Sequence, residues 1–190
     1  MDRDSHSPTA PPRRHLLEIL HREPHWYACR TRARAEKQVD RMLAEAGYET
    51  YLPLVSTPRQ WSDRTKHVAL PLFSGYTFVR FRLADFLSVT QTVGLVHVVG
   101  GRSAPAPVRE EELEAVRCFV RGVEGTGKLP ETVVWWEPGT PVVVLDGPFQ
   151  GMRGFLLEVR APTTRVAVRL TAIRMAVCVE LPRSSLRRVA

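Results

Sequence analysis

The run LPLFSGYTFVRF, residues 70–81, constrains the fold of this chain more than any other stretch. Gly75 marks a bend in it, and residues 76–81 are expected to continue as an extended strand. Because alternate side chains of a strand point to opposite faces, Tyr76 and Phe78 share one face. A strand that is apolar on both faces belongs inside a sheet, so one face needs a covering helix. The aromatic face needs either a second layer or a partner molecule. The face opposite the aromatic one carries Thr77, Val79 and Phe81.

Residues 25–121 have the pattern of a small α/β unit. An aromatic strand at residues 25–30 precedes a helix in which Val39 and Leu43 share an apolar face before Gly47 ends it. A second amphipathic helix is expected at residues 109–120, where three glutamates suit the positive end of the helix dipole. The other expected elements are strands at 48–55, 76–81 and 96–99, a polar loop or hairpin at 56–68 and a short helix at 84–92, giving the order βαββαβα.

The rest of the chain follows other patterns. Residues 1–24 mix charge and proline and are expected to be a flexible leader with at most two helical turns. Residues 122–137 carry three glycines and little periodicity, which is typical of a linker. Residues 138–190 contain short apolar runs separated by turns, which favours a small barrel. The predicted fold class is therefore α+β, an α/β sandwich followed by a linker and a small C-terminal β-barrel. The barrel strands are expected at 142–145, 155–159, 166–170, 176–181 and 186–189.

Composition argues against several classes of protein. No apolar run approaches the ~20 residues that a membrane span needs. Three cysteines stand far apart, which argues against a zinc site and a disulfide framework and favours a reducing, cytoplasmic location. No nucleophile elbow or histidine pair with metal-ligand spacing is present, so we expect no enzyme, cofactor or metal site. The glycine-rich stretch 122–129 has Leu129 where a phosphate-binding loop needs a hydroxyl residue. The net charge of +7 favours contact with nucleic acid or an acidic protein surface.

The segment 56–68 combines basic side chains with one aromatic residue. Arg59, Arg64 and Lys66 flank Trp61 there, a combination that resembles a phosphate-contacting arm. The alternative is that Trp61 only pins the loop to the edge of the sheet, and the sequence leaves both interpretations open.

Two stretches carry a family resemblance. The aromatic strand, a helix containing EKQV, the tripeptide LPL, the central run PLFSGYTFVRF and the segment TVGLVHVVG resemble, in that order, the N-terminal domain of the NusG family of transcription elongation factors. The segment GTPVVVLDGPFQGMRGFLLEV, residues 139–159, is similar to the KOW motif. The motif positions also have a physical interpretation, since they supply a tight turn, bends that close a barrel and a ring that packs across its mouth. They are Asp146, Gly147, Pro148, Phe149, Gly151 and Gly154.

The resemblance implies that residues 25–121 bind RNA polymerase, gripping the clamp helices in an apolar depression of the sheet. Ser88 would face the polymerase gate loop, and a bridge across the cleft would disfavour pausing. Arg30 and Arg32 would approach upstream non-template DNA or nascent RNA. The basic residues Arg59, Arg64 and Lys66 are further expected nucleic-acid contacts. The polymerase-binding residues that the resemblance implies are Trp26, Leu72, Phe73, Tyr76, Phe78 and Ser88.

Departures from the family pattern indicate a specialised paralogue. Ser74 stands where the family has proline, and residues 171–186 lack the Phe-Gly-Arg and Thr-Pro features of housekeeping NusG. Together with the basic segment 56–68, which we call the basic arm, these departures favour an RfaH-like monomer. Such a factor would suppress pausing or termination on a set of long operons. Its KOW domain would contact ribosomal protein, Rho or RNA, and the density of β-branched residues favours strands over hidden helices. The alternative is an RNA- or ribosome-binding KOW module with a scaffold N-terminal domain.

Overall fold

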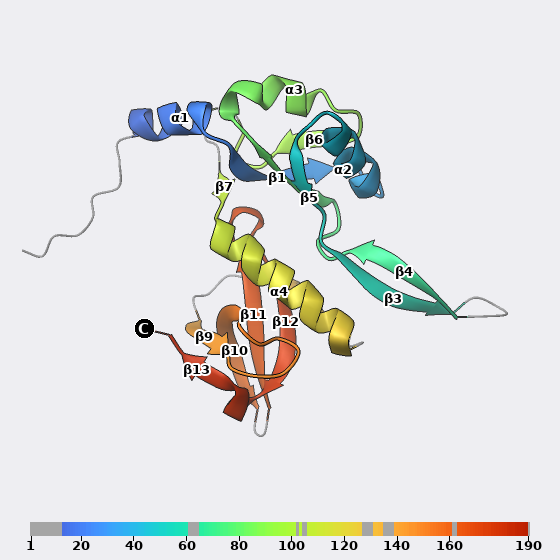
Figure 1. The fold of residues 1–190 in the computed structure, drawn as a ribbon, viewed down its shortest axis with the longest axis vertical. Helices are drawn as coiled ribbons and strands as arrows, with labels where there is room; N and C mark the ends of the chain where they lie inside the picture. Colours follow the sequence, from blue (N-terminus) through green and yellow to red (C-terminus); the bar gives the residue numbers. More distant parts are fainter. Residues whose placement is uncertain are drawn as a thin grey trace, which may run out of the picture.

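The computed structural model describes residues 13–60, 65–101, 103, 106–126, 131–134, 139–160 and 163–189. Two strand-rich parts are joined by a long helix, and a hairpin extends from the first part (Figure 1). The predicted α+β class is confirmed. In chain order the elements are α1 (Arg13–Arg22), β1 (His25–Thr31), α2 (Glu36–Glu45), β2 (Glu49–Tyr51), β3 (Leu54–Gln60), β4 (Thr65–Pro71), β5 (Tyr76–Phe81), η1 (Leu83–Asp85), α3 (Phe86–Thr90), β6 (Leu95–Val98), β7 (Pro107–Val108), α4 (Glu110–Thr126), β8 (Glu131–Val134), β9 (Thr140–Val144), β10 (Arg153–Arg160), β11 (Thr163–Leu170), η2 (Thr171–Ile173), β12 (Met175–Pro182), η3 (Arg183–Ser185) and β13 (Leu186–Arg188).

Strand β5 lies inside the first sheet, as its two apolar faces predict. The strand order is β2-β5-β1-β6, with β7 also paired to β1. All of these pairs are antiparallel, and Phe78 stands opposite Ala28 of β1 and Tyr51 of β2. The predicted division by parity is confirmed, because Val79 belongs to the core on one face and Phe78 to the core on the other.

Helices α2 and α3 cover the face of the first sheet that carries Val79. Val39 and Leu43 of α2 and Val89 of α3 are almost completely buried in this core. The helical spacing of Val39 and Leu43 in the sequence places both on the side of α2 that meets the sheet. One face of β5 therefore has the helical cover that the sequence requires.

Two hydrogen bonds tie α2 to the start of β5. The backbone N–H of Gly75 donates to Glu36 Oε1 at 2.7 Å, and the Thr77 hydroxyl donates to Asp40 Oδ1 at 2.9 Å. Gly75 has a φ of +80°, and a Cβ there would lie 2.8 Å from Nη1 of Arg30. The positive φ favours glycine because this backbone conformation is strained for other residues, whereas the Arg30 guanidinium ends a flexible side chain and can move aside.

The second sheet has the order β13-β9-β10-β11-β12-β8. Its strands β9 to β13 coincide, within a few residues, with the five strands that the sequence predicts. Strand β8 is an addition, because it pairs with β12 although it lies in the range expected to be a linker. Gly154 permits the close approach of β10 and β11, since a Cβ there would lie 2.7 Å from the carbonyl oxygen of Ala167.

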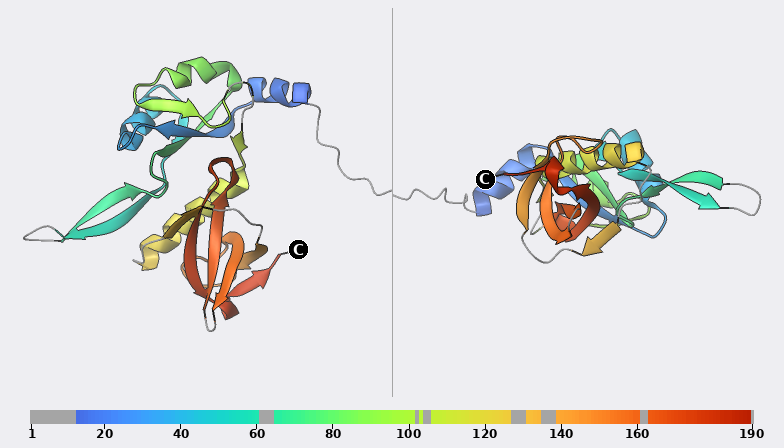
Figure 2. Two further views of the ribbon diagram at one scale, coloured as in Figure 1. Left: turned by 180° about the vertical axis from the view of Figure 1, so that it is seen from behind. Right: turned by 90° about the horizontal axis from the view of Figure 1, so that it is seen from below.

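Helix α4 connects the two sheets through one continuous core. Its residues Leu113, Val116 and Phe119 are fully buried in a cluster that also contains Phe78 of the first sheet and Val168 of the second. Both views in Figure 2 place α4 beside the second sheet. The helix extends to Thr126 rather than ending near residue 120, so the first residues of the expected linker are helical.

The predicted leader also contains a regular helix. Helix α1 spans ten residues, more than the two turns expected, and Leu20 on its inner face is 1% exposed beside η1. A helix this short is marginal in water by itself, so the contact of Leu20 with the folded part explains why it forms. Residues 1–12 of the leader lie outside the described residues.

Candidate functional site

The aromatic residues predicted to bind a partner gather on one face of the first sheet. Phe73 and Phe78 are completely buried, and their rings meet edge to face with centroids 6.2 Å apart. Trp26 and Leu72 are also buried in this cluster, while Tyr76 is half-buried at its margin. The fold therefore brings these five residues together as an enclosed cluster, which we call the aromatic cluster.

Helix α4 supplies part of the cover over the aromatic cluster. The guanidinium of Arg117 lies 5.6 Å from the ring centroid of Trp26 and 5.1 Å from that of Tyr51, within cation–π range. Glu110 and Glu114 accept hydrogen bonds from the same guanidinium at 2.9 Å and 3.3 Å. Burial raises the pKa of Tyr51 to about 12, although the Arg117 charge acts in the opposite direction. Of the two alternatives for the aromatic face, this conformation has the second layer.

The same helix packs on the second sheet through the turn expected to be a KOW motif. The rings of Phe119 and Phe149 lie 5.9 Å apart between centroids. A Cβ on Gly122 would lie 2.2 Å from the ring of Phe149, so only glycine allows so close an approach. The thiol of Cys118 donates to the carbonyl oxygen of Gln150 at 3.5 Å. Phe149 therefore packs against α4.

The turn itself has the backbone that its sequence predicts. Gly147 and Gly151 have φ values of +75° and +82°, the left-handed region that favours glycine. Asp146 and Pro148 are exposed beside them. The turn formed by these residues presents the buried Phe149 to α4.

A buried carboxylate forms a second link between α4 and the second sheet. Glu112 is 8% exposed and accepts a hydrogen bond from the Thr171 hydroxyl at 2.6 Å and another from the Arg109 guanidinium at 2.7 Å. Sequence reasoning assigned Glu112 only to the helix dipole. Its spacing of three and four residues from Ala115 and Val116 places it on the apolar stripe of α4, and that spacing was the available signal.

The predicted gate-loop residue lies away from the aromatic cluster. Ser88 is exposed on α3, which Figure 1 shows on the far side of the first sheet from α4. The same region holds three exposed large apolar side chains: Leu87 at 61% exposure, Val93 at 64% and Val96 at 56%. Ser88 and the aromatic cluster therefore lie on opposite sides of the first sheet.

The predicted nucleic-acid residues Arg30 and Arg32 lie at the end of β1. Arg30 covers the ring of Tyr76 at 4.8 Å and donates to the carbonyl oxygen of Ser74 at 3.5 Å. Arg32 is exposed. A cavity of about 540 Å³ lies between the β1–α2 loop and the base of the β3–β4 hairpin. Its basic lining residues are Arg30, Arg34 and Lys37.

The basic arm is an antiparallel hairpin of β3 and β4, which extends away from both sheets (Figure 2). Arg59 and Lys66 are opposite each other in its register. Arg64 and Trp61 lie outside the described residues, so neither alternative for Trp61 is tested. The Oγ of Ser56 and Nδ1 of His67 join the two strands by a hydrogen bond of 3.3 Å.

Within the described ranges, no group of three or more His, Cys, Asp or Glu side chains could hold a metal ion. No helix in the same part of the chain is long and apolar enough to cross a membrane.

Comparison with known proteins shows that the first part of the chain is similar to a known family. Residues 24–117 match the family described as "Transcription termination factor nusG". The chain is 27% identical over 176 residues to "Transcription termination/antitermination protein NusG" of Pseudomonas aeruginosa, covering 86% of this chain and 98% of the relative. It is 30% identical over 122 residues to the protein of the same description from Escherichia coli strain K12, covering 61% of this chain and 64% of the relative.

A solved structure described as "Domain interaction in Thermotoga maritima NusG" is also similar. Its sequence is 20% identical, its TM-score is 0.47, and the alignment covers 88% of this chain and 98% of that chain.

Proposed function

Because residues 24–117 carry a NusG-family domain, we propose that this protein is a transcription elongation and antitermination factor that binds RNA polymerase. The NusG family consists of non-enzymatic transcription factors, so the function requires binding rather than chemistry. The observation that carries the proposal is the aromatic cluster, whose residues all lie inside the matched range.

The aromatic cluster suits a helical partner. Phe73, Phe78 and Trp26 are the kind of large, closely packed side chains that carry most of the binding energy at an interface. An amphipathic helix, α4, already contacts this cluster, so the site accepts a helix in a groove. The clamp helices of polymerase would take the place of α4. Polymerase binding is therefore coupled to release of α4 from the cluster.

Two further surfaces complete the proposed complex. Ser88 on the far side of the sheet would contact the gate loop, which would bridge the polymerase cleft and disfavour pausing. Arg30, Arg32 and the basic hairpin would contact upstream non-template DNA or nascent RNA. We propose that this second contact restricts the factor to a set of long operons, as in an RfaH-like paralogue.

A second candidate function is RNA or ribosome binding by residues 138–190, which would act as a KOW module. The observation that favours it is the exposure of Arg183, Arg187 and Arg188, which lie close together in η3 and β13. Such a cluster favours phosphate contacts that weaken as salt increases.

The experiment that tests the proposal is retention of core RNA polymerase by the immobilised full-length chain. Tyr76→Ala should lower the affinity about 30-fold, the effect of losing an anchor worth about 2 kcal/mol. Arg117→Ala, which removes the contact of α4 with Trp26 and Tyr51, should raise the affinity. Arg187→Gln is the matched control and should leave retention unchanged.

Two outcomes would count against the proposal. If polymerase is not retained, or is retained equally by Tyr76→Ala, the aromatic cluster is not a polymerase-binding surface. Salt-sensitive RNA binding that is lost in Arg187→Gln combined with Arg188→Gln, in the absence of polymerase retention, would favour the second candidate.

A further inference from the structure

The cavity between the β1–α2 loop and the base of the β3–β4 hairpin, which we call the loop cavity, has the size of a small-molecule site. Its volume is about 540 Å³. One wall is basic, because Arg34 of the loop and Lys37 of the first turn of α2 line it. The other wall is apolar and contains Val68 and Leu70 of β4. Such a cavity suits a ligand that combines a charged group with a flat apolar part.

A third cation, Arg30, has its charged group at the wall of the loop cavity. Its guanidinium lies 4.8 Å from the ring centroid of Tyr76, and Nη1 donates to the carbonyl oxygen of Ser74 at 3.5 Å. Ser74 and Gly75 both line the cavity, and a Cβ on Gly75 would lie 2.8 Å from the same Nη1. These contacts place the guanidinium beside the turn that forms this part of the wall.

The positive charges of the loop cavity are not balanced by carboxylates. In the part of the chain that the structure describes, none of Arg30, Arg34 and Lys37 forms an ion pair. Glu36 also lines the cavity, but it is 6% exposed and its Oε1 accepts the backbone N–H of Gly75 at 2.7 Å. Three cations around a single carboxylate that already has a donor favour an anionic ligand.

Arg34 occupies its position at a conformational cost. Its φ is +63°, in the left-handed region that is strained for residues other than glycine. The backbone of the loop would therefore be served better by glycine. Strain that is retained beside a cavity is typical of a functional position, which agrees with a role for the Arg34 side chain in binding.

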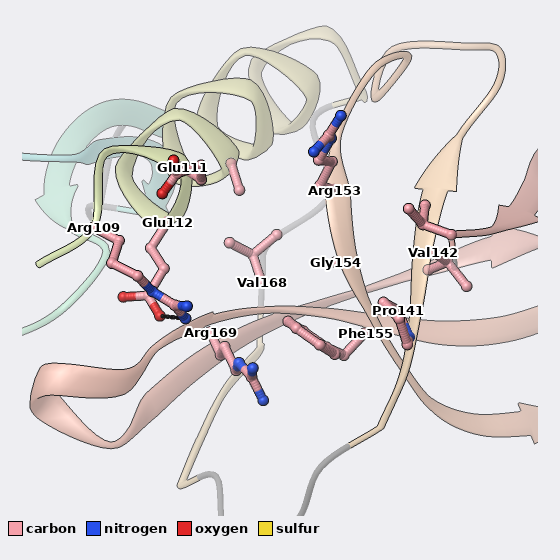
Figure 3. Close-up of a pocket in the computed structure, with 12 residues that line it drawn as sticks. Arg109, Glu111, Glu112, Pro141, Val142, Arg153, Gly154, Phe155, Val168 and Arg169 are labelled. Carbon is pink, nitrogen blue, oxygen red and sulfur yellow. Dashed lines mark hydrogen bonds and ion pairs between the residues drawn. The ribbon is translucent and has the colours of Figure 1, made fainter. Parts of the chain in front are cut away.

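The cavity between α4 and the second sheet has a different arrangement of charges. Its volume is about 470 Å³, and two carboxylates, Glu111 and Glu112, line it. Figure 3 shows Glu112 paired there with Arg109, at 2.7 Å. A phosphate group in that cavity would meet like charges, so the loop cavity is the better site for an anion.

We propose that the loop cavity binds a nucleotide through its phosphate groups. Arg30, Arg34 and Lys37 would contact the phosphates, and the base would lie against Val68 and Leu70. A free nucleoside triphosphate and a nucleotide unit of a single strand present the same groups to this cavity. Binding does not depend on polymerase. It would occupy Arg30, which is proposed above to contact nucleic acid, so a free nucleotide would exclude that contact.

The test uses two fluorescent probes that differ in their phosphates, methylanthraniloyl-ATP and the uncharged methylanthraniloyl-adenosine, titrated into the full-length protein. We expect saturable one-to-one binding of the triphosphate, at least about tenfold tighter than the nucleoside. Lys37→Gln should weaken the triphosphate about tenfold and leave the nucleoside unchanged. Arg41→Gln, which removes a charge from the same helix outside the cavity, is the matched control and should affect neither probe.

Arg34→Gly separates loss of the ligand from loss of the fold. It should weaken the triphosphate about tenfold, whereas the melting temperature should not fall, because glycine adopts a positive φ without strain. Four outcomes would overturn the proposal: no saturable binding of the triphosphate, equal affinity for the two probes, binding unchanged by Lys37→Gln and Arg34→Gly, or binding weakened equally by Arg41→Gln.

Competition identifies the source of the nucleotide. Unlabelled ATP and a short single-stranded oligonucleotide are each added to the protein loaded with methylanthraniloyl-ATP. Displacement by ATP at lower concentration than by the strand supports a free nucleotide as the ligand. Displacement by the strand at lower concentration than by ATP supports a nucleotide unit of nucleic acid. Displacement by neither would show that the probe binds through its fluorescent group and would overturn the proposal.

Discussion

Substitution of Gly122 by alanine tests the contact between α4 and the second sheet. In a helix that touches nothing, Gly→Ala stabilises by about 1 kcal/mol. Here the added Cβ would lie 2.2 Å from Cδ1 of Phe149 and 2.5 Å from its Cε1, so the ring or the helix must move. Overpacking of this kind costs about 1–3 kcal/mol. Taking 2 kcal/mol as its middle value, Gly122→Ala should lower the free energy of unfolding by about 1 kcal/mol.

A double-mutant cycle separates the two contributions. Phe149→Ala removes the ring and should itself destabilise by about 3–5 kcal/mol. In that background the obstruction is absent, so Gly122→Ala should stabilise by about 1 kcal/mol, and the coupling energy should be about 2 kcal/mol. Urea unfolding, followed by tryptophan fluorescence, measures all four free energies. Glu124→Ala, at an exposed position of α4, is the control and should change stability by less than about 0.5 kcal/mol. A stabilising Gly122→Ala in both backgrounds would refute the packing described here.

Three further predictions follow from the described contacts. Burial raises the pKa of Cys29 to about 12. A thiol reagent at pH 8 should therefore label the half-buried Cys118 and leave Cys29 unmodified. Equal labelling of both cysteines in the native protein would contradict this expectation. Gly75→Ala should destabilise by about 1–2 kcal/mol in thermal unfolding, because it places a Cβ at positive φ. An unchanged melting temperature would exclude this strain. Burial also raises the pKa of Tyr27 to about 12. The protonated phenol therefore favours the folded state fully below pH 10, and this stabilisation is lost as the pH rises towards 12. Ultraviolet titration of the native protein, compared with that of Tyr27→Phe, should show that the Tyr27 phenol ionises well above pH 10. Ionisation near pH 10 would contradict this assignment.

Local periodicity was sufficient to predict most of the first sheet and all five strands of residues 142–189. The alternation in β5 places Phe78 and Val79 on opposite faces whatever their neighbours are, because the side chains of a strand alternate by geometry. The turn glycines Gly147 and Gly151 were likewise readable, since their positive φ values are a local property of the chain.

The position of α4 could not be read in the same way. Its apolar stripe predicts that one side is buried, but gives no information on which sheet buries it. The helix in fact contacts both, through Arg117 on Trp26 and through Phe119 on Phe149. The enclosed state of the aromatic cluster follows from that placement. For this reason the sequence predicted which side chains share the aromatic face but not what covers them.

By itself, the sequence determined which residues are apolar, where the chain turns and which side chains share a face, because these depend on neighbours a few positions away. The tertiary structure alone decided that α4 covers the aromatic cluster and that Glu112 reaches Thr171. Glu112 and Thr171 are 59 positions apart, and such contacts depend on how whole elements pack together, which no local pattern encodes.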